Sequence, residues 1–179
     1  MKTRIFILLS LFAIVFTSCN INGSTNTTPE ILFVTNPFVT QKDTLKNYLT
    51  DDGVYHLDTI NVGDTVTFRL IFYGFSNNLS TCNISQSDTT STKLLFPSVS
   101  SLDSVFVASA SDYSIGKFIF KSRISSLYFP FKYVAKKISN DASITFNLSS
   151  DANFSNSSSL GNNSVSFVLK TPIKLRKQI

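Results

Sequence analysis

The chain contains no tryptophan, a single histidine (His56) and two cysteines among its 179 residues, and its one methionine is the initiator. A blue-copper site needs two histidines, a cysteine and usually an axial methionine, and a structural zinc site needs four nitrogen or sulfur ligands. Both kinds of metal centre are therefore excluded by count. We expect no metal and no other cofactor.

Residues suited to catalysis are also scarce. Glu30 is the only glutamate and most aspartates occupy predicted turns, so the carboxylate pair of a glycosidase is not evident. The sequence has neither a Gly-rich phosphate loop nor a Gly-x-Ser-x-Gly elbow. His56 and Asp58 lie two apart in a predicted strand and share a face, where a nearby serine would complete a triad. Such a pair more often forms a surface hydrogen bond, so we expect no enzymatic activity and keep a hydrolase using His56 and Asp58 as the weaker alternative.

Charge of one sign does not dominate the chain. The formal net charge is +5, and part of the surplus lies near the C-terminus at Lys170, Lys174, Arg176 and Lys177. A nucleic-acid footprint needs a dense basic face with interleaved aromatic residues. We therefore expect no nucleic-acid partner, and we interpret residues 173–179 as a solvated basic tail.

The first residues carry the features of an export signal. Lys2 and Arg4 precede an apolar run over residues 5–16, which is shorter than the roughly 20 apolar residues of a membrane-spanning helix. Ordinary signal peptidase prefers small residues one and three positions before the cut, and Phe16 stands three before Cys19. A different processing route is therefore indicated.

The end of this leader, Phe16-Thr17-Ser18-Cys19, resembles the lipobox of bacterial lipoprotein precursors, although Phe16 replaces the usual leucine. The resemblance implies a signal peptide over residues 1–18, lipid attachment at Cys19 and a flexible polar tether over residues 19–29, so that the membrane is a partner through the lipid. By the same resemblance Asn20 favours the outer membrane, facing either the periplasm or the cell surface. The alternative is a secreted protein in which Cys19 pairs with Cys82; otherwise Cys82 is a small buried residue of the core.

Aspartate followed by serine or threonine and then an aliphatic residue or threonine recurs along the chain. Five such triplets begin at Asp43, Asp58, Asp64, Asp88 and Asp103. They resemble an O-glycosylation site that some Gram-negative bacteria use on exported proteins. The resemblance implies these acceptor residues: Thr44, Thr59, Thr65, Thr89 and Ser104. The alternative is that the aspartate forms the turn that opens a strand.

Alternation of apolar and polar residues predicts β-strands throughout the mature chain. The clearest strand covers residues 64–72, where Val66, Phe68 and Leu70 share one face. The other expected strands cover residues 31–35, 55–60, 79–85, 92–96, 104–108, 117–121, 128–133, 143–148 and 165–170. No stretch of ten or more residues shows a helical stripe. Pro130 lies inside a predicted strand, which indicates an edge position or a bulge.

These strands predict an all-β fold, a single antiparallel β-sandwich over residues 30–172 with a phenylalanine-rich core. Residues 60–68, which join a turn to a strand, resemble the corresponding part of bacterial immunoglobulin-like domains, so the sandwich is expected to be immunoglobulin-like. Tyr128, Lys132 and Lys136 share the side of their strand opposite Phe129 and form either a contact surface or packing for a second sheet.

Two functions remain for such a domain. The first is a membrane-anchored cell-envelope lipoprotein with a binding or scaffolding role toward other envelope proteins. The second is a glycan-binding module of a nutrient-uptake system, whose sugar would stack on tyrosines because tryptophan is lacking. An exposed tyrosine pair would favour the glycan, and an uncovered edge strand would favour a protein partner.

Overall fold

The computed structural model describes residues 26–40, 44–50, 54–155 and 161–176. Short and long β-strands are the main regular secondary structure of this part of the chain. Their bounds are β1 (Glu30–Phe33), β2 (Asn47–Leu49), β3 (Tyr55–Leu57), β4 (Ile60–Asn61), β5 (Thr65–Tyr73), β6 (Leu79–Gln86), β7 (Thr92–Leu95), β8 (Lys117–Ile119), β9 (Ser126–Ala135), β10 (Ser143–Ser150), β11 (Ser164–Lys170) and β12 (Ile173–Lys174).

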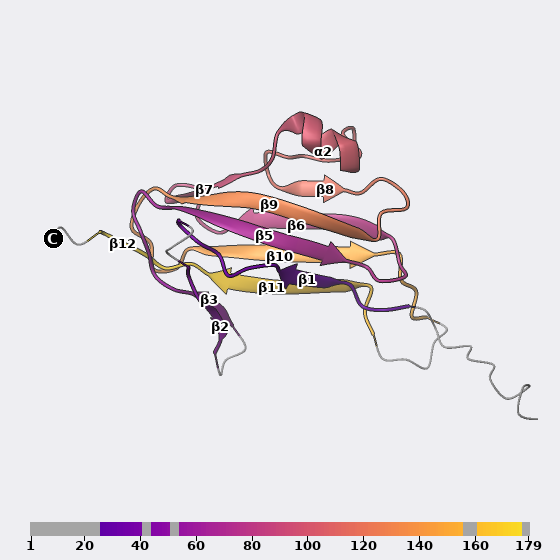
Figure 1. Cartoon of the computed structure of the whole chain (residues 1–179), viewed down its shortest axis with the longest axis horizontal. Helices are drawn as coiled ribbons and strands as arrows, with labels where there is room; N and C mark the ends of the chain where they lie inside the picture. The colour runs from indigo at the N-terminus through magenta and orange to yellow at the C-terminus, as the bar shows by residue number, and fades with distance from the viewer. Residues whose placement is uncertain (1–25, 41–43, 51–53, 156–160, 177–179) are drawn as a thin grey trace, which may run out of the picture.

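The strands form two sheets that face each other, which confirms the predicted all-β sandwich (Figure 1). The front sheet has the order β1-β5-β9-β7 and the back sheet the order β2-β3-β11-β10-β6-β8. A further pair, β12-β4, lies at the end of the sandwich where the chain terminates. Neighbouring strands pair antiparallel, except that β11 runs parallel to β3 and β12 parallel to β4. The antiparallel prediction therefore holds for the long strands of both sheets.

Strict alternation explains why the two sheets pack together. In β5 every second side chain, from Val66 to Phe72, is buried, and β10 shows the same alternation through Ile144, Phe146 and Leu148. Aromatic rings fill the space between the sheets. The rings of Phe68 and Phe131 stack with centroids 4.7 Å apart. Because complete burial of a phenylalanine side chain contributes roughly 1.5–3 kcal/mol, this layer is the main source of stability.

One predicted strand is wrong. Residues 99–105 form the helix α2 (Val99–Val105), and only Phe106 of the stretch predicted over residues 104–108 makes a β-bridge, to Phe120. Leu102 and Phe106 are both buried, and their spacing of four residues puts them on the same side of a helical turn. The helix has only seven residues, too few for a repeated apolar stripe to show in the sequence.

Pro130 lies where the sequence predicted an edge or a bulge. On one side it faces Arg69 of β5, while the pairing of β9 with β7 covers only residues 132–135. At Pro130 the strand β9 is therefore locally an edge, although it runs in the middle of the front sheet. The missing N–H of proline costs no ladder hydrogen bond at such a position.

Both ends of the described chain contact the sandwich. The Asn26 side chain accepts a hydrogen bond from the Asn77 amide at 3.1 Å and another from the Asn153 backbone N–H at 3.0 Å, and Pro29 is buried. These residues belong to the stretch predicted as a tether. At the opposite end (Figure 1), Ile173 of the predicted tail is buried in β12.

Candidate binding faces of the sandwich

His56 and Asp58 lie at the β3 margin of the back sheet. His56 is half-buried within β3, and Asp58 follows the end of that strand. One carboxylate oxygen of Asp58 accepts a hydrogen bond from the Lys46 backbone N–H at 2.8 Å, and the Asp58 N–H donates to the Lys46 carbonyl at 3.0 Å. Asp58 thereby ties the segment before β2 to the segment after β3. Neither residue lines any of the cavities described below.

Two of the described triplet aspartates, Asp64 and Asp88, have structural partners beside the start of a strand. Asp64, which is 5% exposed, precedes β5 and accepts a hydrogen bond from the Asn61 N–H at 2.9 Å; its other oxygen lies 2.5 Å from the Arg176 guanidinium. Asp88 accepts hydrogen bonds from the N–H groups of Ser91 and Thr90, just before β7. These contacts support the strand-opening role for both aspartates.

The two remaining aspartates of the triplets differ. Asp103 lies inside α2 and accepts a hydrogen bond from the Tyr113 hydroxyl at 2.7 Å, so it opens no strand. Asp43 lies outside the described residues. Among the predicted acceptor residues, Thr65 is half-buried. The exposed ones are Thr44, Thr59, Thr89 and Ser104. Glycosylation of these five residues stays a prediction.

Cys82 is a buried free thiol in β6, opposite Leu148 of β10 and Phe118 of β8. Burial raises the pKa of this thiol far above its usual range. The packing role expected for Cys82 is confirmed. Cys19, the predicted lipid-attachment residue, lies outside the described residues.

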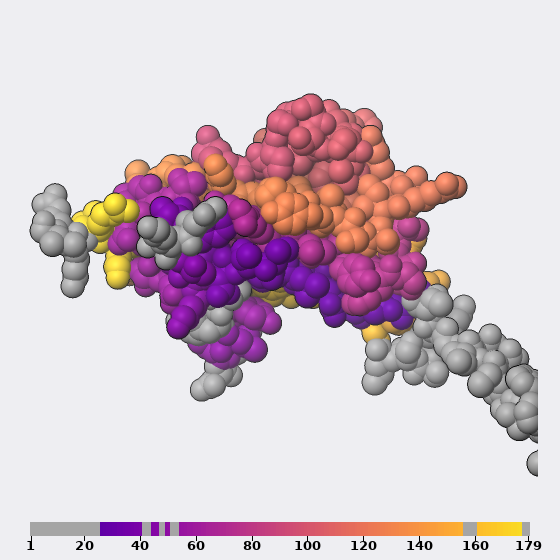
Figure 2. All heavy atoms as spheres, viewed as in Figure 1, coloured from indigo at the N-terminus to yellow at the C-terminus, as the bar shows by residue number. Residues whose placement is uncertain are grey.

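The outer face of the front sheet carries several exposed apolar side chains. Leu32 of β1 lies opposite Ile71 of β5, which lies opposite Tyr128 of β9, so these three side chains form one row across the sheet. Tyr73 stands one step along β5 on the same side, diagonal to Tyr128. Leu32, Tyr73 and Tyr128 are 44%, 36% and 51% exposed. We call Leu32, Ile71, Tyr73 and Tyr128 the front face; Figure 2 shows this side of the molecule.

The structure decides whether the strip of Tyr128, Lys132 and Lys136 packs against a second sheet or faces solvent. Tyr128, Lys132 and Lys136 are all exposed while Phe129, on the other side of β9, is buried. The strip therefore faces solvent, and the second-sheet packing considered for it is wrong.

Next to this strip, where β7 leaves Pro130 unpaired, lies a shallow cavity of about 410 Å³. Its lining is mostly apolar: Thr67, Leu95, Phe96, Pro97, Pro130, Phe131 and Lys132.

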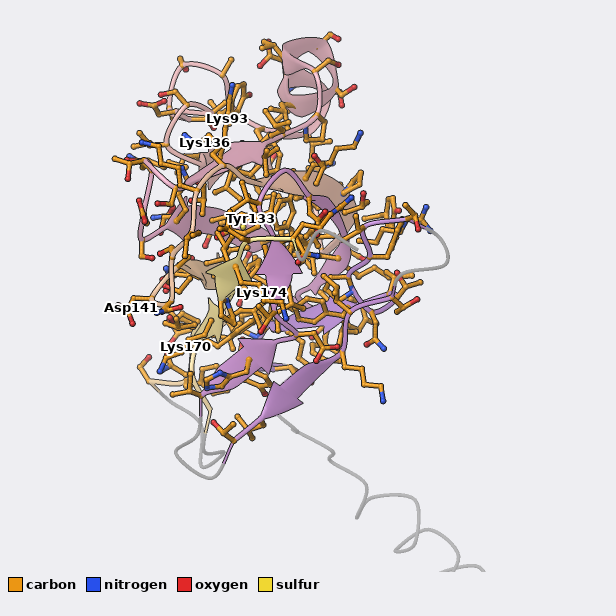
Figure 3. The ribbon with its side chains drawn as sticks, turned by 90° about the vertical axis from the view of Figure 1, so that its left-hand side faces the viewer. Lys93, Tyr133, Lys136, Asp141, Lys170 and Lys174 are labelled. Carbon is orange, nitrogen blue, oxygen red and sulfur yellow. The ribbon has the colours of Figure 1, made fainter. Side chains whose placement is uncertain are left out.

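A second cavity, of about 300 Å³, opens between the edges of β6 and β7 and is called here the mouth cavity. Its lining residues are Ser85, Gln86, Thr89, Lys93, Leu94, Phe96, Ser114 and Ile115. The Gln86 Oε1 atom is buried and has no hydrogen-bond partner; within the described chain it is the one buried side-chain polar atom in that condition. Figure 3 shows Lys93 and Lys136 together at the end of the sandwich that faces the viewer.

The sequence offered a signal for the mouth cavity that its interpretation missed. Cys82 and Ile84 point into the core, and Gln86 continues the same alternation along β6. An amide at a position that the pattern reserves for an apolar side chain indicates either a buried hydrogen bond or a ligand. The cavity itself also needs Ser114 and Ile115, from a turn distant in sequence, and only the fold brings these residues beside β6.

Over residues 26–40, 44–50, 54–155 and 161–176, no group of three or more histidine, cysteine, aspartate or glutamate side chains is arranged to hold a metal ion. Within the same ranges no helix is long and apolar enough to cross a membrane.

The fold and its exposed faces define a β-sandwich protein with candidate binding surfaces. No family model matches the chain, and no curated protein matches it. Among solved structures, the chain is similar to a DUF4466 family protein from Parabacteroides merdae, with a TM-score of 0.39 and 10% sequence identity. The similarity covers 84% of this chain and 45% of that protein, so the chain spans less than half the length of that structure.

Proposed function

We propose that this protein is a lipid-anchored lipoprotein of the outer membrane that works without catalysis, binding or scaffolding another envelope protein through the front face. The observation that carries the proposal is the row of exposed Leu32, half-buried Ile71 and exposed Tyr128, extended by exposed Tyr73. The face of an isolated sheet that meets only water usually carries polar side chains. An apolar patch with tyrosines on a flat surface is typical of protein interfaces.

The anchoring part of the proposal is supported by the leader and by the place where the chain meets the sandwich. Residues 20–25 separate Cys19 from Asn26, and a segment of that length spans no more than about 25 Å even when fully extended. Asn26 is hydrogen-bonded at one end of the sandwich, beside the turn that contains Asn77. A lipid on Cys19 would hold that end close to the membrane and leave the front face accessible from the side.

The anchor is tested by intact mass and membrane partitioning in a Gram-negative host, comparing the wild type with Cys19→Ala. A diacyl mass increment, and membrane retention that Cys19→Ala abolishes, are the expected results. Additional hexose-sized mass would support O-glycosylation. A wild-type protein that is soluble and has no lipid mass would refute the anchor and restore the secreted alternative.

The partner site is tested with a photo-crosslinking amino acid placed at Tyr128 in intact cells. We expect a discrete higher-mass adduct that Tyr73→Ser diminishes in the same chain. The matched control is the same crosslinker at Val99, an apolar residue that is 62% exposed. Val99 belongs to α2, which lies apart from β1 and β5 (Figure 1). An absent adduct at Tyr128, or an equal adduct at Val99, would refute the front face as the interface.

A second candidate function is glycan binding, favoured by the exposed pair Tyr73 and Tyr128. Sugars stack on aromatic rings through their C–H faces, so the ring rather than the hydroxyl matters most. In affinity electrophoresis through gels that contain polysaccharides, retardation lost in Tyr128→Ala but kept in Tyr128→Phe would support this reading. Equal mobility of all three proteins in every polysaccharide would exclude it.

A further inference from the structure

We propose that the mouth cavity is a binding site for a single neutral sugar residue, separate from the front face and independent of the lipid anchor. The cavity combines an unpaired acceptor, an unpaired cation, hydroxyl groups and an apolar wall within about 300 Å³. Each of these features has a counterpart in the chemistry of a pyranose.

The acceptor is Gln86 Oε1, which is buried without a hydrogen-bond partner. Leaving a buried carbonyl oxygen unpaired is unfavourable, so such atoms usually mark a missing water or ligand. Gln86 ends β6, where its backbone pairs with Ile144, and the pairing of β6 with β8 stops at Asn83. The side chain therefore lies where β6 has an open edge. Because Oε1 is buried, the Gln86 side chain has to turn into the cavity before a ligand hydroxyl can donate to it.

The other lining elements contribute a hydrogen-bond donor, Lys93, and a further acceptor, Ser114. Lys93 of β7 is exposed at the cavity, and within the described residues the ion pair found joins Arg176 to Asp64, so Lys93 has no carboxylate partner there. Its ammonium can donate to ligand oxygens. The Ser114 hydroxyl donates to Asp112 at 2.6 Å and so keeps its oxygen available as an acceptor. Sugar hydroxyls both donate and accept, which suits this mixed set.

The apolar wall suits the other side of a sugar ring. Phe96 is half-buried, with its ring 5.0 Å from that of Phe118 and nearly perpendicular to it, so its position is fixed by the core. Leu94 and Ile115 complete the wall. Cavities that bind small molecules range from about 300 to 1,000 Å³, and this one stands at the lower limit. That size fits one sugar unit, such as the end of a longer chain.

Two carboxylates near the cavity favour a neutral ligand over an acidic one. Asp112 holds Ser114, and Asp88 holds the turn that contains Thr89. Hydrogen bonds from Ser114 lower the pKa of Asp112, and hydrogen bonds from Ser91 and Thr90 lower the pKa of Asp88. Both groups stay ionised at neutral pH and offset the charge of Lys93. An acidic ligand would be repelled by the carboxylates of Asp88 and Asp112, whereas a neutral sugar would not.

The test is saturation-transfer NMR and calorimetric titration of the full chain carrying Cys19→Ala, with glucose, galactose, mannose and N-acetylglucosamine, and with glucuronate as the acidic comparison. We expect saturable binding of at least one neutral sugar with a Kd of millimolar order, weakened about tenfold by Lys93→Met. The control Lys137→Met, an exposed lysine outside the cavity lining, should bind as the wild type does.

Gln86→Leu gives a result that a structural role for Gln86 would not produce. It removes the unpaired acceptor at similar volume, so we expect sugar binding to be lost while the melting temperature stays constant or rises. Should this variant fail to fold, Lys93→Met still tests the sugar site, because replacing an exposed lysine should not prevent folding. Three results would overturn the proposal: no saturable binding of any neutral sugar, which would leave only water in the cavity; unchanged binding in Lys93→Met; or tighter binding of glucuronate.

Discussion

Replacing Gly116 with alanine should be among the most damaging single-methyl additions in this protein. Gly116 has φ of +72°, and a Cβ atom built there would lie 2.0 Å from the Ile84 carbonyl oxygen and 3.1 Å from the Phe96 ring. An alanine in the left-handed region costs about 1–2 kcal/mol by itself. The contact at 2.0 Å involves backbone atoms and cannot be relieved by a side-chain rotation, so the turn must move away from β6.

That movement would break the hydrogen bond from the Ile84 N–H to the Gly116 carbonyl, which measures 2.9 Å. Its loss adds about 0.5–1.5 kcal/mol, so Gly116→Ala should lower the free energy of unfolding by about 1.5–3.5 kcal/mol in total. In urea unfolding followed by circular dichroism, the midpoint should fall by roughly 1–2 M. The mouth cavity should be affected as well, because Ser114 and Ile115 belong to the turn that moves.

Gly63→Ala is the matched control. Gly63 also has a positive φ, +92°, but a Cβ atom there would have no heavy atom within 4 Å. Only the backbone strain applies, so a loss of about 1–2 kcal/mol is expected. Equal midpoints for the two variants would refute the reasoning, since close approach to Ile84 would then contribute nothing.

Further predictions concern the core, the thiol and the acid response. Tyr133→Phe removes the buried hydrogen bond between the Tyr133 and Thr171 hydroxyls, 2.7 Å long, and should lower the free energy of unfolding by about 1 kcal/mol in urea titrations; Thr171→Val in the same background should cost less than it does alone. Cys82 should not react with a thiol reagent at pH 8 in the native protein and should react fully in urea, because burial raises its pKa. Hydrogen bonds from neighbouring residues lower the pKa of Asp88, so its stabilising effect is present above pH 4 or so and is lost as the pH falls through its folded-state value. Asp88→Asn should therefore flatten the acid side of the curve of melting temperature against pH.

Local patterns predicted the long strands because burial on one side imposes a period of two residues. The alternation from Val66 to Phe72 in β5 and from Ile144 to Leu148 in β10 appears unchanged in the fold. The helix α2 escaped detection because seven residues hold too few apolar positions to distinguish a helical turn from a short strand. The parallel pairing of β3 with β11 also escaped, since alternation identifies a strand's faces but not its neighbour.

The candidate sites were also only partly predictable from the sequence. The front face was partly predictable, because Tyr128 and Lys132 share the side of β9 opposite Phe129. Whether that side met water or another sheet depended on the number of layers, which the sequence pattern does not encode. The mouth cavity depended on long-range placement: its residues come from β6, from β7 and from the turn around Gly116.

The attachment of residues 26–29 at one end of the sandwich determines how the fold would bear mechanical load. β1 begins at that end and pairs with β5 over four residue pairs, while the described chain ends at the opposite end of the molecule (Figure 1). A pull on the N-terminal segment that is directed along the long axis acts along β1 and shears its hydrogen bonds all at once. A pull at right angles would open them one by one at much lower force. The protein is therefore built to resist tension along its long axis and to yield when β1 is peeled sideways.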